Sequence, residues 1–165
     1  MKQIIFALLL MLPQIIFAQN SPTSIFSSFQ DTQSSANQCF TKDCIGVVTR
    51  DADRCFSEDC AAIVTGDSNR CHSKNCTAIV THDANRCFTR DCAGYLSGDP
   101  KQCFTKDCAA IVAQDPSQCF TKDCIAYVTG DPKQCFTKDC IAIVSSFSKG
   151  LRPIEIGAIK LLLEW

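Results

Sequence analysis

The sequence predicts an all-β fold, a β-solenoid of seven 16-residue coils stapled by disulfides. Three observations lead to this prediction. Two series of cysteines each recur with a step of sixteen residues, so the chain contains an internal repeat. Small and aliphatic residues alternate after the second cysteine of every copy, with the period of two that is typical of a strand buried on one face. Turn-forming residues such as Asp-Pro separate successive copies.

The N-terminal part of the 165-residue chain precedes the repeats. Lys2, an apolar run over residues 4–12 and the small residue Ala18 have the pattern of a secretory signal peptide over residues 1–18. An uncleaved membrane anchor is the alternative. Residues 19–37 are rich in Ser, Gln and Thr without any period, so we expect a flexible leader there.

The repeat unit reads Q/R-C-F-T-K-D-C-x-A-I-V-T-G-D-P-K, and seven copies occupy residues 38–146. All fourteen cysteines lie in this array, a density that favours disulfides in an exported chain. Pairing inside each C-x4-C uses every cysteine, whereas pairing between copies leaves two over, although sequence alone does not fix the connectivity. Each small loop would contribute about 2 kcal/mol. The expected pairs are Cys39–Cys44, Cys55–Cys60, Cys71–Cys76, Cys87–Cys92, Cys103–Cys108, Cys119–Cys124 and Cys135–Cys140.

The strand interpretation assigns each column of the repeat to a face. The cysteines, the Gly/Ala column and the Val/Leu column two residues further on face inward. The aliphatic row that begins with Val47 and the Thr/Ser row that begins with Thr49 face outward. So does the residue after the first cysteine, and an exposed apolar row of this length indicates a partner, self-association or a surface. This candidate binding face consists of Phe40, Phe56, Phe88, Phe104, Phe120 and Phe136; the alternative places these rings in the core.

The rival fold is an α-helical solenoid with one short helix per sixteen residues. Asp-Pro-x-Gln is also a helix-start pattern, and Gly98 or Gly130 just before it suits the end of a preceding helix. Three arguments favour strands. Residues five apart on a helix lie about 140° apart, so both cysteines of a unit cannot face one partner helix. The segment after the second cysteine is rich in β-branched residues. Finally, Arg at the third helical position opposes the helix dipole.

The C-terminal segment, residues 147–165, leaves the sixteen-residue register. Its apolar part, "IEIGAIKLLLEW", contains three charged residues and is too short to span a bilayer, so we expect no transmembrane span. An open solenoid end is an exposed sheet edge, and we expect this segment to cap it. Contact with a membrane or a partner is the alternative.

The sequence contains no set of reactive groups apart from the repeat. We therefore expect no enzymatic activity, no catalytic residue and no cofactor. The formal net charge of −1 provides no basic field for nucleic acid. A metal-sequestering cysteine array is an alternative, but C-x4-C lies at the edge of zinc-site spacings, so no metal ligand is predicted. Asn75 begins the one N-x-T glycosylation motif of the array.

The sixteen-residue period, the inward cysteines and the outward Thr row are similar in architecture to insect disulfide-stapled ice-binding solenoids and to bacterial ice-nucleation repeats. The Thr-x-Thr motif of those families is absent, so the resemblance assigns no family and implies ice binding only as an alternative function. Our first prediction is a secreted, disulfide-rich repeat protein that serves as a binding or structural module. Its expected partner is an extracellular protein, glycan or surface, with self-association as a further option.

Overall fold

The computed structural model describes residues 32–146 and 152–163. The predicted signal peptide, most of the predicted leader and residues 147–151 lie outside the described residues. Within the described residues there are helices and no strand, so the predicted all-β solenoid is wrong. The helical alternative fits, because every sixteen-residue repeat contributes one short α-helix.

Each of the first six repeats pairs an α-helix with a short 3-10 helix that leads into the next repeat. The α-helices of the seven repeats are α2 (Lys42–Thr49), α3 (Glu58–Thr65), α4 (Lys74–Thr81), α5 (Arg90–Ser97), α6 (Lys106–Ala113), α7 (Lys122–Thr129) and α8 (Lys138–Ser146). The 3-10 helices between them are η1 (Ala52–Arg54), η2 (Ser68–Arg70), η3 (Ala84–Arg86), η4 (Pro100–Gln102), η5 (Pro116–Gln118) and η6 (Pro132–Gln134). Two helices lie outside the repeats, α1 (Thr32–Ala36) and α9 (Pro153–Leu163).

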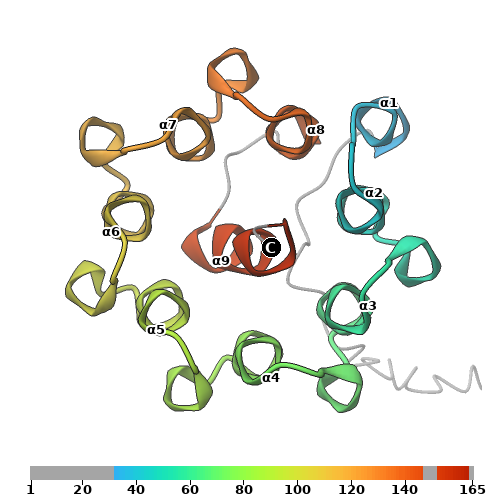
Figure 1. The fold of residues 1–165 in the computed structure, drawn as a ribbon, viewed down its shortest axis with the longest axis horizontal. Coiled ribbons are helices and arrows are strands. Elements are labelled where there is room, and N and C mark those ends of the chain that lie inside the picture. Colours follow the sequence, from blue (N-terminus) through green and yellow to red (C-terminus); the bar gives the residue numbers. More distant parts are fainter. Residues whose placement is uncertain (1–31, 147–151, 164–165) are drawn as a thin grey trace, which may run out of the picture.

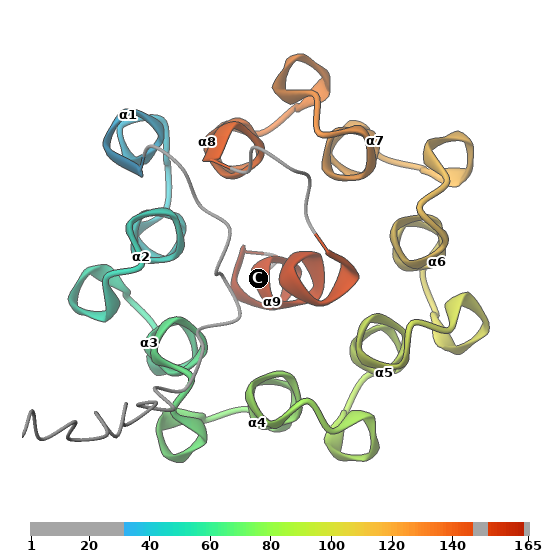
Figure 2. The same ribbon diagram turned by 180° about the vertical axis from the view of Figure 1, so that it is seen from behind.

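The repeats form a closed ring. Helices α2 to α8 surround a central space, the 3-10 helices lie outside them, and α9 lies in the middle (Figure 1; Figure 2). The ring closes because α8 contacts α2, and α1 packs against both of these helices at the junction. Helix α1 falls inside the segment expected to be a flexible leader, and it takes the outer position that a 3-10 helix takes at the other junctions.

Local sequence explains where each repeat helix begins and ends. The Thr or Ser two residues after the first cysteine caps the helix; the Thr41 hydroxyl, for example, accepts the Cys44 N–H at 3.1 Å. The residue after the helix adopts the left-handed conformation in six repeats, and three of these residues are Gly66, Gly98 and Gly130. The next residue is the recurring Asp, whose side chain caps the 3-10 helix, with Pro at the first position in three copies.

The three arguments for strands fail for identifiable reasons. Only the second cysteine of each pair lies on the helix, since Cys39 precedes the cap Thr41, so the 140° objection does not apply. The Ile and Val residues of the repeat helices are buried or half-buried, and packing stabilises these short helices despite their low intrinsic propensity. Arg54 ends the 3-10 helix η1 and pairs with its cap Asp51 at 3.2 Å, so it does not oppose the dipole of an α-helix.

The core includes a row that we predicted to face outward. Residues three after the second cysteine are at most 7% exposed and cluster with Ile156 and Ile159 of α9. The prediction was wrong because a helix turns 100° per residue, so this row shares a side with the second cysteine instead of alternating with it. The row consists of Val47, Ile63, Ile79, Tyr95, Ile111, Tyr127 and Ile143.

The Gly/Ala column packs against the disulfide of the next repeat. A Cβ added to Gly46 would collide with the Cys55 sulfur, and one added to Gly94 would collide with the Cys103 sulfur. In the remaining repeats this position is a fully buried Ala. A larger side chain would push the neighbouring disulfide away, which explains why the column holds only the two smallest residues.

Helix α9 runs through the ring in the direction opposite to α2–α8. Its first turn lies near the end of α2, where burial lowers the pKa of the Arg50 guanidinium and the Glu155 carboxylate opposes that shift. Glu155 is 1% exposed and forms an ion pair with Arg152, with an N–O distance of 2.8 Å. Further along, a Cβ at Gly157 would lie 2.8 Å from Tyr95, so α9 packs closely on α5. We expected this segment to cap the last repeat, whereas α9 contacts α2 to α6.

Candidate binding face

A repeated hydrogen bond fixes how neighbouring helices are arranged. Asp43, the second residue of α2, accepts the backbone N–H groups of Phe56 at 2.6 Å and Ser57 at 3.0 Å, just before α3 begins. The equivalent side chain does the same in every later repeat. The starts of neighbouring helices are therefore held together, and α2–α8 all begin at one end of the ring. We call this end the N-terminal face.

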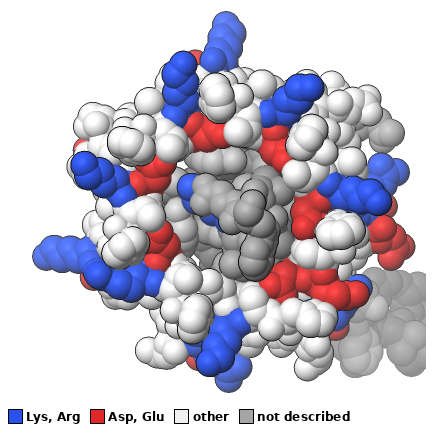
Figure 3. Space-filling model, in the orientation of Figure 1, with Lys and Arg blue, Asp and Glu red and all other residues white. Residues whose placement is uncertain are grey.

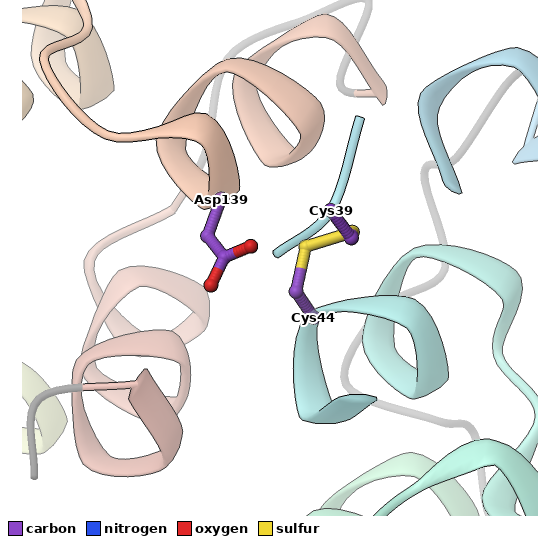
Figure 4. Close-up of side chains that lie close together, drawn as sticks. All are labelled: Cys39, Cys44 and Asp139. Atoms are coloured by element: carbon purple, nitrogen blue, oxygen red, sulfur yellow. A yellow bond between two sulfur atoms is a disulfide. The ribbon is translucent and has the colours of Figure 1, made fainter. Parts of the chain in front are cut away.

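The same bond closes the ring. Asp139 of the last repeat accepts the N–H groups of Phe40 at 2.5 Å and Thr41 at 3.2 Å, across 99 and 98 residues of sequence. Figure 4 shows the Asp139 carboxylate beside the Cys39–Cys44 disulfide. The junction between the last and first repeats thus reproduces the junction between any two consecutive repeats. Sequence reasoning missed it, because no residue pattern identifies Asp139 as a partner of the first repeat.

Six phenylalanines form the most exposed apolar row of the described residues. Their side chains are 77–82% exposed, and each follows the first cysteine of a repeat at the N-terminal face. They are the predicted binding-face residues Phe40, Phe56, Phe88, Phe104, Phe120 and Phe136. His72 occupies the seventh place, and its N–H makes the same bond to Asp59 at 2.6 Å. The fold therefore does not require phenylalanine at this position of the repeat.

A basic row accompanies the phenylalanines. The first residue of each repeat helix is exposed, and in six helices it is Lys or Arg: Lys42, Lys74, Arg90, Lys106, Lys122 and Lys138. The exception, Glu58, pairs with Arg70 at 3.3 Å. Figure 3 shows most Lys and Arg side chains around the outside of the ring and most acidic side chains closer to its centre.

The Asp side chains of this face are engaged in hydrogen bonds, and four of the six are buried. Asp43, Asp59, Asp107 and Asp139 are only 8–9% exposed. Each carboxylate accepts two backbone N–H groups of the next repeat, so much of its charge is compensated inside the protein. The Lys and Arg side chains, in contrast, extend into solvent.

The cysteines form the seven disulfides inside the C-x4-C units, with Cα–Cα distances of 5.5–5.6 Å. An Asp of the preceding repeat lies close to each of several pairs, including Asp139 beside Cys39 and Cys44. Zinc is bound by thiolates, and no cysteine in the described part of the chain is free. These clusters therefore join neighbouring repeats and offer no thiolate ligand.

Asn75 replaces Asp in the repeated hydrogen bond. Its side-chain oxygen accepts the N–H groups of Phe88 at 2.8 Å and Thr89 at 3.2 Å, and its amide nitrogen donates to the Thr89 hydroxyl at 3.1 Å. Glycosylation at Asn75 stays a prediction. The nitrogen that would carry the glycan is the one that donates to Thr89.

A cavity of about 700 Å³ adjoins the N-terminal face between α9 and helices α4–α6. Ile79, Tyr95 and Gly157 contribute its apolar lining, and Asp91 and Asp107 lie at its polar part. Both carboxylates accept backbone hydrogen bonds from the following repeat. The cavity therefore continues the face inward without presenting a free acid.

No protein-family model, curated protein sequence or solved structure matches this chain. The functional inference consequently depends on the geometry of the N-terminal face. Among the described residues, no helix has both the length and the apolar character needed to cross a bilayer.

The Thr/Ser row on which the ice-binding alternative depends does not form an outward ladder. The hydroxyls of Thr49, Thr65 and Thr81 each donate to the backbone carbonyl four residues earlier at 2.7 Å. Helical geometry directs these groups along their own helices, and the helices are distributed around a ring. A flat surface therefore meets no regular plane of free Thr hydroxyls on this row.

Proposed function

We propose that this protein is a secreted, non-enzymatic binding module that presents its N-terminal face to an extracellular partner. The observation that supports this most strongly is the row of six phenylalanines with 77–82% exposure. Isolated exposed apolar side chains are ordinary, but six equivalent phenylalanines repeated on one face indicate an interaction surface.

The disulfides support the extracellular part of the proposal. Seven disulfides within 102 residues, from Cys39 to Cys140, suit an oxidising compartment, where such bonds persist. Expression with the complete N-terminal segment tests this. We expect protein recovered from the medium of a secreting host to begin near Gln19, as found by N-terminal sequencing. Retention of the full segment on cell-associated protein would contradict secretion.

The binding part is tested by comparing two folded proteins on the same panel of immobilised glycans, lipids and extracellular-matrix proteins. One is the wild type, and the other carries Phe104→Ser, Phe120→Ser and Phe136→Ser. We expect the wild type to bind at least one class of partner and the triple variant to lose that binding. Equal binding by both proteins, or no binding by either, would contradict a role for the N-terminal face.

A matched control is available within the chain. Because the three Phe side chains are exposed and His72 shows that a polar residue is accepted, the triple variant should keep its helical circular dichroism spectrum and its disulfides. Non-reducing mass spectrometry and the melting temperature check this before binding is measured.

A further inference from the structure

The phenylalanine row lies at one level of the ring. Every repeat places the residue after its first cysteine by the same bond to the preceding repeat, and the last repeat does so for Phe40. Residues related by such a closed repeat surround the ring axis at similar heights. A partner that contacts all of them at once must itself be broad and flat.

The backbone that carries these rings is fixed. Each Phe lies between a disulfide-bonded cysteine and a helix cap, and its N–H is bonded to a side chain of the neighbouring repeat. Little backbone entropy remains to be lost on binding, so the exposed rings are preorganised for contact.

The exposed charge next to the rings is basic. Six of the seven helices begin with Lys or Arg, and the one acidic exception is paired with Arg70. Of the Asp carboxylates of the same face, four are only 8–9% exposed and two, Asp91 and Asp123, are half-buried. All six accept backbone N–H groups of the next repeat. A broad surface approaching the ring therefore meets ammonium and guanidinium groups together with aromatic rings.

We infer that the N-terminal face binds the surface of an anionic lipid bilayer. Interfacial binding requires apolar side chains that enter the boundary below the headgroups and cations that attract the headgroup charge. The six phenylalanines supply the first requirement and the six first-turn cations supply the second. This inference rests on the proposed function and specifies its partner class; an acidic protein surface is the outcome against which it is tested.

Vesicle partitioning measures this binding with the complete mature chain. Vesicles of phosphatidylcholine alone are compared with vesicles that also contain phosphatidylglycerol, at about 0.1 M salt, where charges beyond ~10 Å are screened. We expect binding to the anionic vesicles to be at least about tenfold stronger than to the neutral ones. Raising the salt concentration should weaken it.

Two double variants distinguish the contribution of the basic row at the N-terminal face from the effect of the protein's net charge. Lys122→Gln with Lys138→Gln removes two first-turn cations, and Lys101→Gln with Lys133→Gln removes two exposed cations from the outer 3-10 helices. Both variants have the same net charge. We expect the first to weaken vesicle binding by about tenfold or more and the second to leave it within about twofold.

The Phe104→Ser, Phe120→Ser and Phe136→Ser variant tests the apolar part, and we expect at least about tenfold weaker binding. Equal binding to neutral vesicles, equal loss in both lysine pairs, or no vesicle binding by the wild type overturns the lipid inference. The wild type could instead fail to bind vesicles and bind an acidic protein that the triple Phe→Ser variant does not bind. That result would support the proposed binding module and reject only its lipid partner.

Discussion

The Asp that follows each first helical residue decides how repeats are joined. Its carboxylate satisfies two N–H groups at the start of the next repeat, groups that precede a helix and have no partner within it. Asn75 shows what this position requires. Its side-chain oxygen still accepts the backbone N–H of the next repeat. The hydrogen bond between side chains runs in the opposite direction: the Asn75 amide donates to the Thr89 hydroxyl, whereas the Thr121 hydroxyl donates to Asp107. An oxygen acceptor is therefore needed, and a negative charge is not.

We predict that Asp107→Ala lowers the free energy of unfolding by about 1–3 kcal/mol, because two backbone N–H groups at a part-buried junction lose their acceptor. Asp107→Asn should cost less than about 1 kcal/mol, since Asn75 makes the same bonds. Denaturant unfolding with the disulfides intact measures both values. Equal losses in the two variants would show that charge, and not the acceptor oxygen, holds the junction.

At the scale of the element, the residue that ends each repeat helix alternates between Gly and a larger residue from one repeat to the next. The left-handed residue that follows the helix is Gly after α3, α5 and α7, the helices of the second, fourth and sixth repeats. It is Arg50, His82 or Gln114 after α2, α4 and α6. All six residues lie in the left-handed region, with φ of 68–74° at the Gly residues and 55° at the others, so this helix end costs more energy where the residue carries a Cβ.

We predict opposite effects from exchanging these residues. His82→Gly should raise the free energy of unfolding by about 1 kcal/mol, because φ is +55° there and glycine adopts that conformation without a Cβ clash. Gly98→Ala should lower it by about 1 kcal/mol, although a Cβ would meet no atom within 4 Å, because φ is +68°. Thermal melts of the two variants against the wild type check the signs; a stabilising Gly98→Ala would contradict the assigned conformation.

At the scale of the molecule, the chain forms a ring and not an open rod. Seven junctions held by the same pair of backbone hydrogen bonds leave no exposed end, which removes the problem that an open solenoid solves with capping repeats. The apolar inner row then encloses a space that α9 enters, and α9 contributes Ile156 and Ile159 to the common core. The broad, regular N-terminal face is a direct consequence of this closure.

Closure predicts that the junction between the last and first repeats is as stable as an internal one. We expect Asp139→Ala to cost about 1–3 kcal/mol, the same as Asp107→Ala within about 0.5 kcal/mol. Denaturant unfolding of the two variants side by side provides the measurement. An Asp139→Ala protein as stable as the wild type would mean that the ring is open at this point.

The sequence by itself determined the repeat. The cysteine register established seven sixteen-residue units and their disulfide content, and the Gly/Ala column showed that a small side chain is required after the second cysteine. These features are visible because they depend on residues within one unit or in the next. The Asp-Pro pattern was readable as a helix start, and it begins the 3-10 helices, whereas the Thr caps of the α-helices were not identified from the sequence.

Tertiary structure decided the rest. A stretch of eight residues rich in Ile and Val suits a strand or a buried helix equally well, and packing around the ring selects the helix. That choice places the Val47 row inside, where alternation had placed it outside. The position of α9 and the Asp139 bond depend on the number of repeats and the angle between them, because only a complete circuit brings the last repeat beside Phe40.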